Sequence, residues 1–221
     1  MIETGVLFDN THSFQDLNLI LSAVEITPAI PKTTYVDIPG GDGSIDLTES
    51  NGEVKFSDRT ITFTFTMNPA DDLSESAWEA KKTEVSNVLN GRAFGKITLD
   101  KDPDYYWRGR CSVDNFKSNK RLRQIIVTAK VRPYKYKQAE TVTAFSLTTS
   151  GKAVVLTNSR RSVCPVITCT NNNTKIIFNG NTFTFNAGTH KNLDIRLTEG
   201  VNSLTVSGTG KVTFTYQEGD L

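Results

Sequence analysis

The chain has 221 residues, of which 37% are hydrophobic and 22% are charged, and its 25 basic and 24 acidic residues give a formal net charge of +1. These values are typical of a folded protein. They exclude the strong basic surplus with which many proteins bind nucleic acid without sequence preference. The length suffices for one large β domain or for two smaller domains with separate cores.

Neither a targeting segment nor a disulfide framework is indicated. The N-terminus lacks the basic and apolar runs of a signal peptide, and no stretch approaches the ~20 apolar residues that span a bilayer. We therefore expect no membrane contact and folding in a cytoplasm. The three cysteines, Cys111, Cys164 and Cys169, are too few for a disulfide framework and lack zinc-site spacing. We expect free thiols that pack like small apolar side chains.

Short strands are predicted before the first long one. Residues 18–26 alternate partly between apolar and polar, and shorter strands are expected at 35–38 and 45–48. The glycine-rich loop 39–43 between the last two lacks the lysine and the spacing of a phosphate-binding loop. We interpret it as a mobile loop.

The clearest strand signal covers residues 60–67. Ile61, Phe63, Phe65 and Met67 alternate there with four threonines. Because successive side chains of a strand point to opposite faces, this pattern predicts a half-buried strand with one apolar face and one threonine face.

One helix is predicted. Either Asp71 or Asp72 can cap its start, apolar residues recur at helical spacing over 73–89, and Asn90-Gly91 can end it. We expect the helix to cover one face of the sheet. Trp78 shares the phase of the apolar stripe, so we interpret it as the anchor of this packing and not as a ligand-stacking residue.

Three further strands are predicted after the helix, at 96–99, 105–110 and 124–131. The turn 100–104 has aspartates at alternate positions, but it lacks the glycine and the final acid of an EF-hand loop, so we expect a solvated turn. The basic segment 117–123 is interpreted as a hairpin tip that faces an acidic neighbour.

Composition changes near residue 137, where threonine, asparagine and glycine begin to dominate and strands become short. Asn179-Gly180 is a strong hairpin turn. Short strands at regular spacing predict a β-sandwich, so we divide the chain into domains 1–138 and 139–221. The strands expected in the second domain are 142–147, 153–157, 166–170, 175–178, 182–186, 193–197, 203–206 and 211–216.

No catalytic, cofactor or metal motif emerges. His12 and His190 are far apart in sequence, and neither lies near a nucleophile signature. No carboxylate pair stands out among the 24 acids. We therefore predict no catalytic residues, no cofactor and no metal. A hydrolase with an unrecognised site is one alternative, which the missing motifs disfavour.

The order of features along nearly the whole chain resembles the phage distal tail protein family. Each motif is short, and their order and spacing together carry the likeness. The segments concerned are Tyr35–Gly40, Gly43–Thr48, Arg59 before the alternating strand, Tyr106–Arg110, Arg132–Lys135, Gly200–Gly208 and Val212–Tyr216.

The resemblance implies a mainly β protein: an N-terminal belt domain with one helix, followed by a small galectin-like sandwich. It implies that six belt domains close into a ring that continues the tail tube and seats the tip proteins. The expected partners are further copies of the chain, the tail tube protein, a tail-tip protein and a receptor-binding protein, at the virion tail tip. Neither nucleic acid nor membrane is implied as a partner.

A ring needs head-to-tail contacts, and a long loop such as 39–52 has the reach to make them. The interface residues predicted on this ground, together with the basic tip, are Gly40, Gly41, Asp42, Gly43, Ile45, Asp46, Leu47, Lys120 and Arg121.

The alternative function is a monomeric carbohydrate-binding β-sandwich module. Such a module would present exposed aromatic side chains for stacking on sugars. The aromatic residues of the second domain fall in strand alternation, which predicts core positions for most of them. They are Phe178, Phe183, Phe185, Phe214 and Tyr216.

Overall fold

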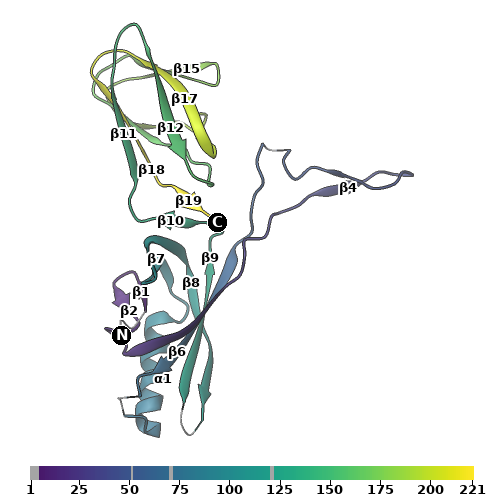
Figure 1. The fold of residues 1–221 in the computed structure, drawn as a ribbon, viewed down its shortest axis with the longest axis vertical. Helices are drawn as coiled ribbons and strands as arrows, with labels where there is room; N and C mark the ends of the chain where they lie inside the picture. The colour runs from purple at the N-terminus through teal and green to yellow at the C-terminus, as the bar shows by residue number, and fades with distance from the viewer. Residues whose placement is uncertain (1–4, 51, 70–71, 120–121) are drawn as a thin grey trace. The chain divides into compact units, whose positions relative to one another are not determined.

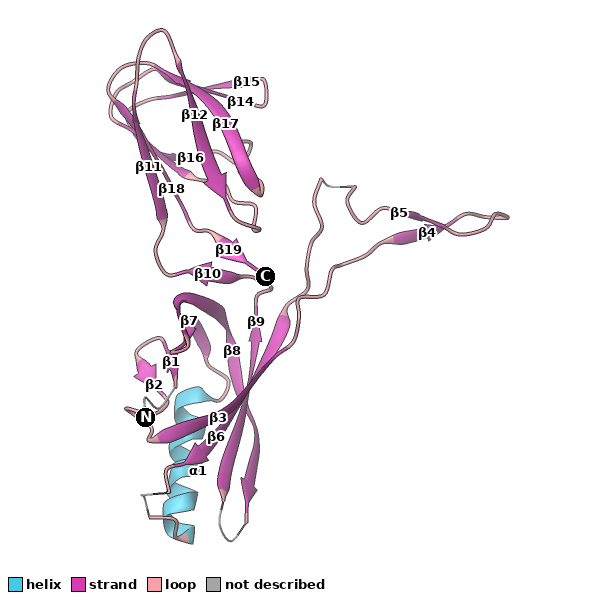
Figure 2. Cartoon of the chain, in the orientation of Figure 1, coloured by secondary structure: helices cyan, strands magenta, loops and turns pink. Residues whose placement is uncertain are grey.

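The structure, a computed structural model, describes residues 5–50, 52–69, 72–119 and 122–221 (Figure 1). It is mainly β with one helix (Figure 2), which confirms the predicted fold class. The chain divides into two compact units, Met1–Lys135 and Tyr136–Leu221. Each unit has its own hydrophobic core and is described by itself.

An antiparallel sheet with the strand order β2-β1-β7-β8-β9-β6-β3 forms the centre of the first unit. The strands β8 and β9 form a long hairpin, and next to its last pair Asn119 N donates to the carbonyl oxygen of Leu122 at 2.9 Å. The strands are β1 (Val6–Phe8), β2 (Thr11–His12), β3 (Leu19–Ile26), β6 (Arg59–Met67), β7 (Ala93–Leu99), β8 (Asp102–Ser118) and β9 (Arg123–Val131).

The alternation in β6 sorts its side chains as predicted. Ile61, Phe63 and Phe65 are fully buried in the core, whereas the threonines between them face the other side of the sheet. Phe8 of β1 meets the ring of Phe63 edge-on, with the centroids 5.7 Å apart. Each such aromatic pair contributes about 1 kcal/mol beyond the apolar area that it buries.

The helix α1 (Glu75–Leu89) packs against β8 and β9 on the core face of the sheet. Trp78 is 3% exposed, which confirms its predicted role as the anchor. The predicted start is corrected: Ser74 is the N-cap and accepts from Ala77 N, while Asp72 only supports Ser74. Asp71 lies outside the described residues. The helix ends at Asn90-Gly91 as predicted, with Gly91 in the left-handed region at φ +73°.

Two four-stranded antiparallel sheets form the second unit, with the orders β11-β18-β13-β16 and β12-β17-β14-β15. Asn179 and Gly180 both have positive φ and close the hairpin of β14 and β15, as predicted. The strands of these sheets are β11 (Thr141–Ser146), β12 (Lys152–Asn158), β13 (Val166–Cys169), β14 (Thr174–Phe178), β15 (Asn181–Phe185), β16 (Gly188–Lys191), β17 (Gly200–Ser207) and β18 (Lys211–Tyr216). Two further strands, β10 (Lys135–Lys137) and β19 (Gly219–Asp220), pair with each other outside the two sheets.

One predicted strand of the second unit is wrong. Residues 193–197 form no strand and only make a bridge from Leu197 to Val163. The edge strand is β16 instead, which pairs with β13. Alternation marked 193–197 because Ile195 and Leu197 are buried, but their backbone has no long ladder to join.

Candidate functional site

A long excursion of the chain leaves the sheet between β3 and β6. We call residues 27–58 the arm; Figure 1 shows it projecting from the sheet as a thin two-stranded ribbon. Backbone hydrogen bonds join the two chain segments near the base of the arm. In one of them Ser57 N donates to the carbonyl oxygen of Ile30 at 2.9 Å. At its base the rings of Phe56 and Tyr134 meet edge-on at 6.0 Å. The arm is therefore a regular ribbon fixed at one end.

The outer part of the arm is a hairpin of β4 (Tyr35–Asp37) and β5 (Ser44–Asp46). Gly41 N donates to the carbonyl oxygen of Ile38 at 3.1 Å, with Pro39 and Gly40 between them. Gly40 has φ +73°, so the turn has the left-handed glycine that a type II turn requires and the preceding proline that such turns favour.

The hairpin presents an apolar face to solvent. Val36 and Ile45 are cross-strand neighbours, and Ile38 and Leu47 follow them at alternate positions. Large apolar side chains in such a row are rarely left uncovered in a monomer. Their exposed fractions are 48% for Val36, 43% for Ile38, 53% for Ile45 and 41% for Leu47.

The other side of the hairpin is polar and acidic. Side-chain and backbone hydrogen bonds from Thr48 lower the pKa of Asp46, which keeps this carboxylate ionised. From 33 to 54 the sequence has no basic residue and five acids, of which Glu53 pairs with Lys55. The acids are Asp37, Asp42, Asp46, Glu49 and Glu53.

A two-stranded ribbon alone is marginally stable in water. The arm buries little apolar surface within its own unit, because almost every residue from 27 to 50 is exposed. The exposure of the arm therefore points to a partner that covers it.

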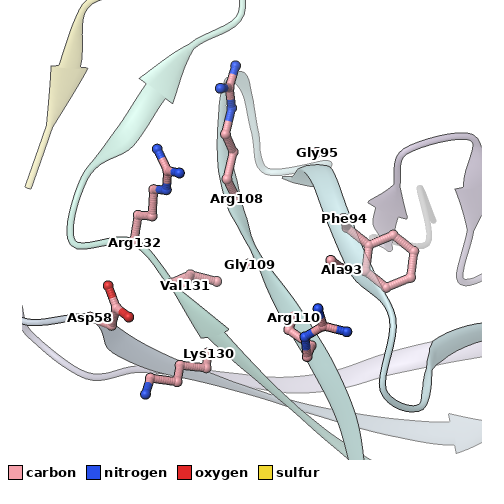
Figure 3. A pocket seen from close by; sticks show the side chains of 10 residues that line it. All are labelled: Asp58, Ala93, Phe94, Gly95, Arg108, Gly109, Arg110, Lys130, Val131 and Arg132. Carbon is pink, nitrogen blue, oxygen red and sulfur yellow. The ribbon is translucent and has the colours of Figure 1, made fainter.

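A second feature of the first unit is a hollow of about 470 Å³ on its sheet. Small residues, Ala93, Gly95 and Gly109, form part of its lining. Figure 3 shows the basic side chains placed around it, with Gly109 and Val131 between them. The charged residues of the lining are Arg108, Arg110, Lys130, Arg132 and Asp58.

The basic residues of the hollow lie opposite one another along β8 and β9 and just beyond the end of β9. Arg110 and Lys130 are direct cross-strand neighbours, and Arg132 N donates to the carbonyl oxygen of Arg108 at 3.0 Å. Like charges placed opposite each other destabilise a sheet. Lys130 and Arg132 make no ion pair with any residue that the structure describes.

Gly109 allows β8 and β9 to approach closely at the floor of the hollow. A Cβ at this position would lie 2.2 Å from the carbonyl oxygen of Lys130 and 2.7 Å from Cγ1 of Val131. Real Cβ atoms do not come so near to backbone oxygen, so this position excludes any other side chain without a shift of a strand.

The structure brings seven of the nine predicted interface residues together on the arm, from Gly40 to Leu47. The other two, Lys120 and Arg121, lie outside the described residues. Sequence reasoning missed Tyr35, Val36 and Ile38 on the same hairpin, and the whole basic hollow. The alternation in Arg108-Gly109-Arg110 and Lys130-Val131-Arg132 was the available signal, because it places each basic pair on one face of a strand.

The predicted acidic turn and the histidines have structural partners. Asp100 accepts hydrogen bonds from Gly5 N and His12, and Asp102 pairs with Lys135 at 2.9 Å. Among the described residues, no group of three or more His, Cys, Asp or Glu side chains could hold a metal ion. Nor does any described helix have the length and apolar character to cross a membrane.

The aromatic side chains of the second unit point inward. Phe214 and Tyr216 are buried, and Phe145 and Phe183 pack partly buried against the same core. The exposed positions of β12, β14 and β17 instead carry residues without an aromatic ring, such as Val155, Ile177 and Val201. This fully described unit therefore offers no exposed aromatic platform on which a sugar could stack.

The helix, the arm and most of the sheet of the first unit fall within a known family of protein domains. Residues 10–132, more than half of the chain, match the family described as the phage tail protein RIFT-related domain, and the chain belongs to this family of phage tail proteins. The match thus covers the helix, the arm and the strands of the sheet from β2 to β9, but not β1. No curated protein matches the chain in sequence.

The fold of the chain is similar to that of one particular tail protein. It matches the crystal structure of the phage SPP1 Dit protein (gp 19.1) with a TM-score of 0.70 and 13% sequence identity, over 99% of both chains. The SPP1 protein is described as a paradigm of the hub adsorption apparatus in phages that infect Gram-positive bacteria. The resemblance to distal tail proteins that the sequence shows is confirmed by the family and the fold.

Proposed function

We propose that this protein is the structural hub of a long-tailed phage tail tip. Six copies form a ring that joins the tail tube to the proteins of the tip or baseplate. Membership of a phage tail family and a fold shared with an SPP1 protein described as a hub support this proposal. The observation that carries it is the arm, whose exposed apolar face calls for a partner.

A closed ring uses heterologous contacts, in which one surface of a copy meets a different surface of the next copy. An arm that projects from the sheet supplies the first of these surfaces. We infer that its residues Gly40, Gly41, Asp42, Gly43, Ile45, Asp46 and Leu47 lie in the contact between copies. The tail tube protein, the tail-tip protein and a receptor-binding protein would then meet the faces of the ring.

A hub of this kind works by position and needs no turnover. The proposed role therefore assigns no catalytic residue, cofactor or metal. The carbohydrate-binding alternative gains no support from the inward-facing aromatics of the second unit.

The test is the mass of the purified chain by light scattering across a concentration series, with negative-stain imaging. We expect a species of six times the 24.4 kDa chain mass and a ring with a central channel. Changing the arm's apolar face, as in Val36→Ser with Ile45→Ser, should shift the protein to monomer. Val155→Ser with Val201→Ser is the matched control, because these valines are comparably exposed but lie in the second unit.

A monomer at every concentration, alone and with the tail tube protein added, would refute the ring. A ring that survives loss of the arm's apolar face would instead refute the role of the arm.

A further inference from the structure

We propose that the hollow on the sheet of one copy is the acceptor for the arm of the next copy. This inference rests on the ring-forming function proposed above and adds the second surface of its contact. It commits to one occupant, the acidic hairpin of another copy of this chain.

Charge is the first argument. Four basic residues and one acid line the hollow, which leaves a local surplus of three positive charges. The arm carries the opposite sign, because residues 33–54 contain five acids and no basic residue. The whole chain is nearly neutral, so this division between two surfaces of one unit is not a consequence of composition.

The second argument is the repulsion among the basic side chains of the hollow, which destabilises the free protein. Arg110 faces Lys130 directly across the β8–β9 ladder, and Arg132, one residue beyond the end of β9, is bonded through its backbone N–H to Arg108 of β8. Like charges at these positions work against the sheet that carries them. A carboxylate-bearing partner that enters the hollow removes this repulsion.

Shape is the third argument. Ala93, Gly95 and Gly109 give the lining little side-chain bulk, so a ribbon can approach the backbone there. The acidic side of the hairpin, which carries Asp37, can then face the basic side chains of the hollow. The charges of the two surfaces set orientation and partner choice.

The arm does not fill the hollow of its own chain. Of all arm residues only Asp58, at the very base, belongs to the lining, and neither β4 nor β5 contributes to it. The two surfaces are therefore separate on one copy, as a heterologous contact requires.

A charge swap tests the pairing. Lys130→Glu with Arg132→Glu should weaken self-association by roughly a hundredfold, and so should Asp37→Lys with Asp42→Lys, since each sets like charges against each other. A chain with all four changes should recover association, because the signs are again opposite. Lys175→Glu with Lys211→Glu, on exposed strand positions of the second unit, is the control and should assemble like the wild type.

A chemical cross-link locates the contact directly. Carbodiimide joins carboxylates to amines without a spacer, and Lys130 is the only lysine of the lining. In a mixture of unlabelled and ¹⁵N-labelled chains, we expect Lys130 to couple to an arm acid of the other isotope. The yield should fall with added salt, because screening weakens charge pairing over distances above ~8 Å at physiological ionic strength.

The outcomes separate the two proposals. If the wild type forms no ring, the proposed function fails. The wild type could form a ring while the variant Lys130→Glu with Arg132→Glu assembles normally, or Lys130 could couple only within its own chain. In either case the proposed function stands and the hollow is not the acceptor. If the variant with all four substitutions associates again, the pairing is supported. If it stays dissociated although each double variant has also dissociated, the pairing is contradicted.

Discussion

The Nε2 atom of His12 lies 3.0 Å from Oδ2 of Asp100, across 88 residues of sequence. The other ring nitrogen, Nδ1, accepts hydrogen bonds from the backbone N–H groups of Phe14 and Gln15. Since Nδ1 accepts, the proton of the neutral ring sits on Nε2 and is donated to Asp100. One side chain thus ties the β1–β2 hairpin to the turn before β8.

Two substitutions of His12 separate the contribution of its bond to Asp100 from that of its bonds to the backbone N–H groups. His12→Asn should retain an acceptor for the two backbone N–H groups and lose only the bond to Asp100, at a cost of about 1 kcal/mol. His12→Ala should lose both and cost roughly 2–3 kcal/mol. Trp78 and Trp107 both lie in the first unit, so tryptophan fluorescence during urea unfolding reports its stability. Equal losses for the two variants would contradict this assignment.

Gly109 is predicted to tolerate no side chain. Gly109→Ala forces Cβ against the carbonyl oxygen of Lys130, and we expect a loss of about 1–3 kcal/mol in the first unit. Gly95→Ala is the control in the same hollow, since its Cβ meets only a side-chain oxygen of Asp9 at 3.3 Å. The same unfolding experiment compares them, and a Gly109→Ala protein as stable as Gly95→Ala would show that the strands can separate.

Glu218 should make the second unit sensitive to acid. Burial raises the pKa of this carboxyl, but hydrogen bonds from Thr141 and Lys137 and the charge of Lys137 outweigh it and lower the pKa below the ordinary 4.5. A lowered folded-state pKa adds stability that is present above pH 4.5 and is lost as pH falls through the folded value.

The check on Glu218 is a comparison with Glu218→Gln by hydrogen exchange of peptides from the second unit. The wild type should be more stable at neutral pH, by about 1–3 kcal/mol, and this advantage should disappear under acid. A constant difference between the two proteins at all pH values would contradict the linkage.

Cysteine reactivity follows burial. Burial raises the pKa of Cys111 to about 12 and also raises the pKa of Cys169, whereas Cys164 is partly exposed. Since the thiolate is the nucleophile, iodoacetamide at about pH 8 should modify Cys164 alone in the folded protein. Intact-mass measurement should show one adduct, none for Cys164→Ser, and three for the wild type after denaturation. Rapid labelling of Cys111 in the folded state would contradict the described packing.

Local patterns in the sequence were enough to predict many elements. The threonine–aromatic alternation of β6, the apolar stripe that buries Trp78 and the Asn179-Gly180 turn are all present in the structure. Each depends on residues that are close in sequence, where periodicity and turn chemistry act directly. Helix capping by Ser74 was missed because several adjacent polar residues could serve equally well.

The functional surfaces needed more than local pattern. The glycine-rich loop suggested a reaching segment, but only the register of β4 and β5 shows that Val36 and Ile45 share a face. The hollow draws its lining from β7, β8, β9 and the base of the arm, which lie up to 74 residues apart, from Asp58 to Arg132. No single stretch of sequence shows such a set together.

The sequence by itself determined that this protein is mainly β, with one helix and a long glycine-rich loop, because side-chain periodicity and turn chemistry are properties of neighbouring residues. Only the tertiary structure decided that the arm leaves its apolar row exposed and that alternate basic residues in and next to β8 and β9 surround one hollow. The physical reason is that strand pairing sets which distant residues become neighbours, and pairing is fixed by the packing of the whole core.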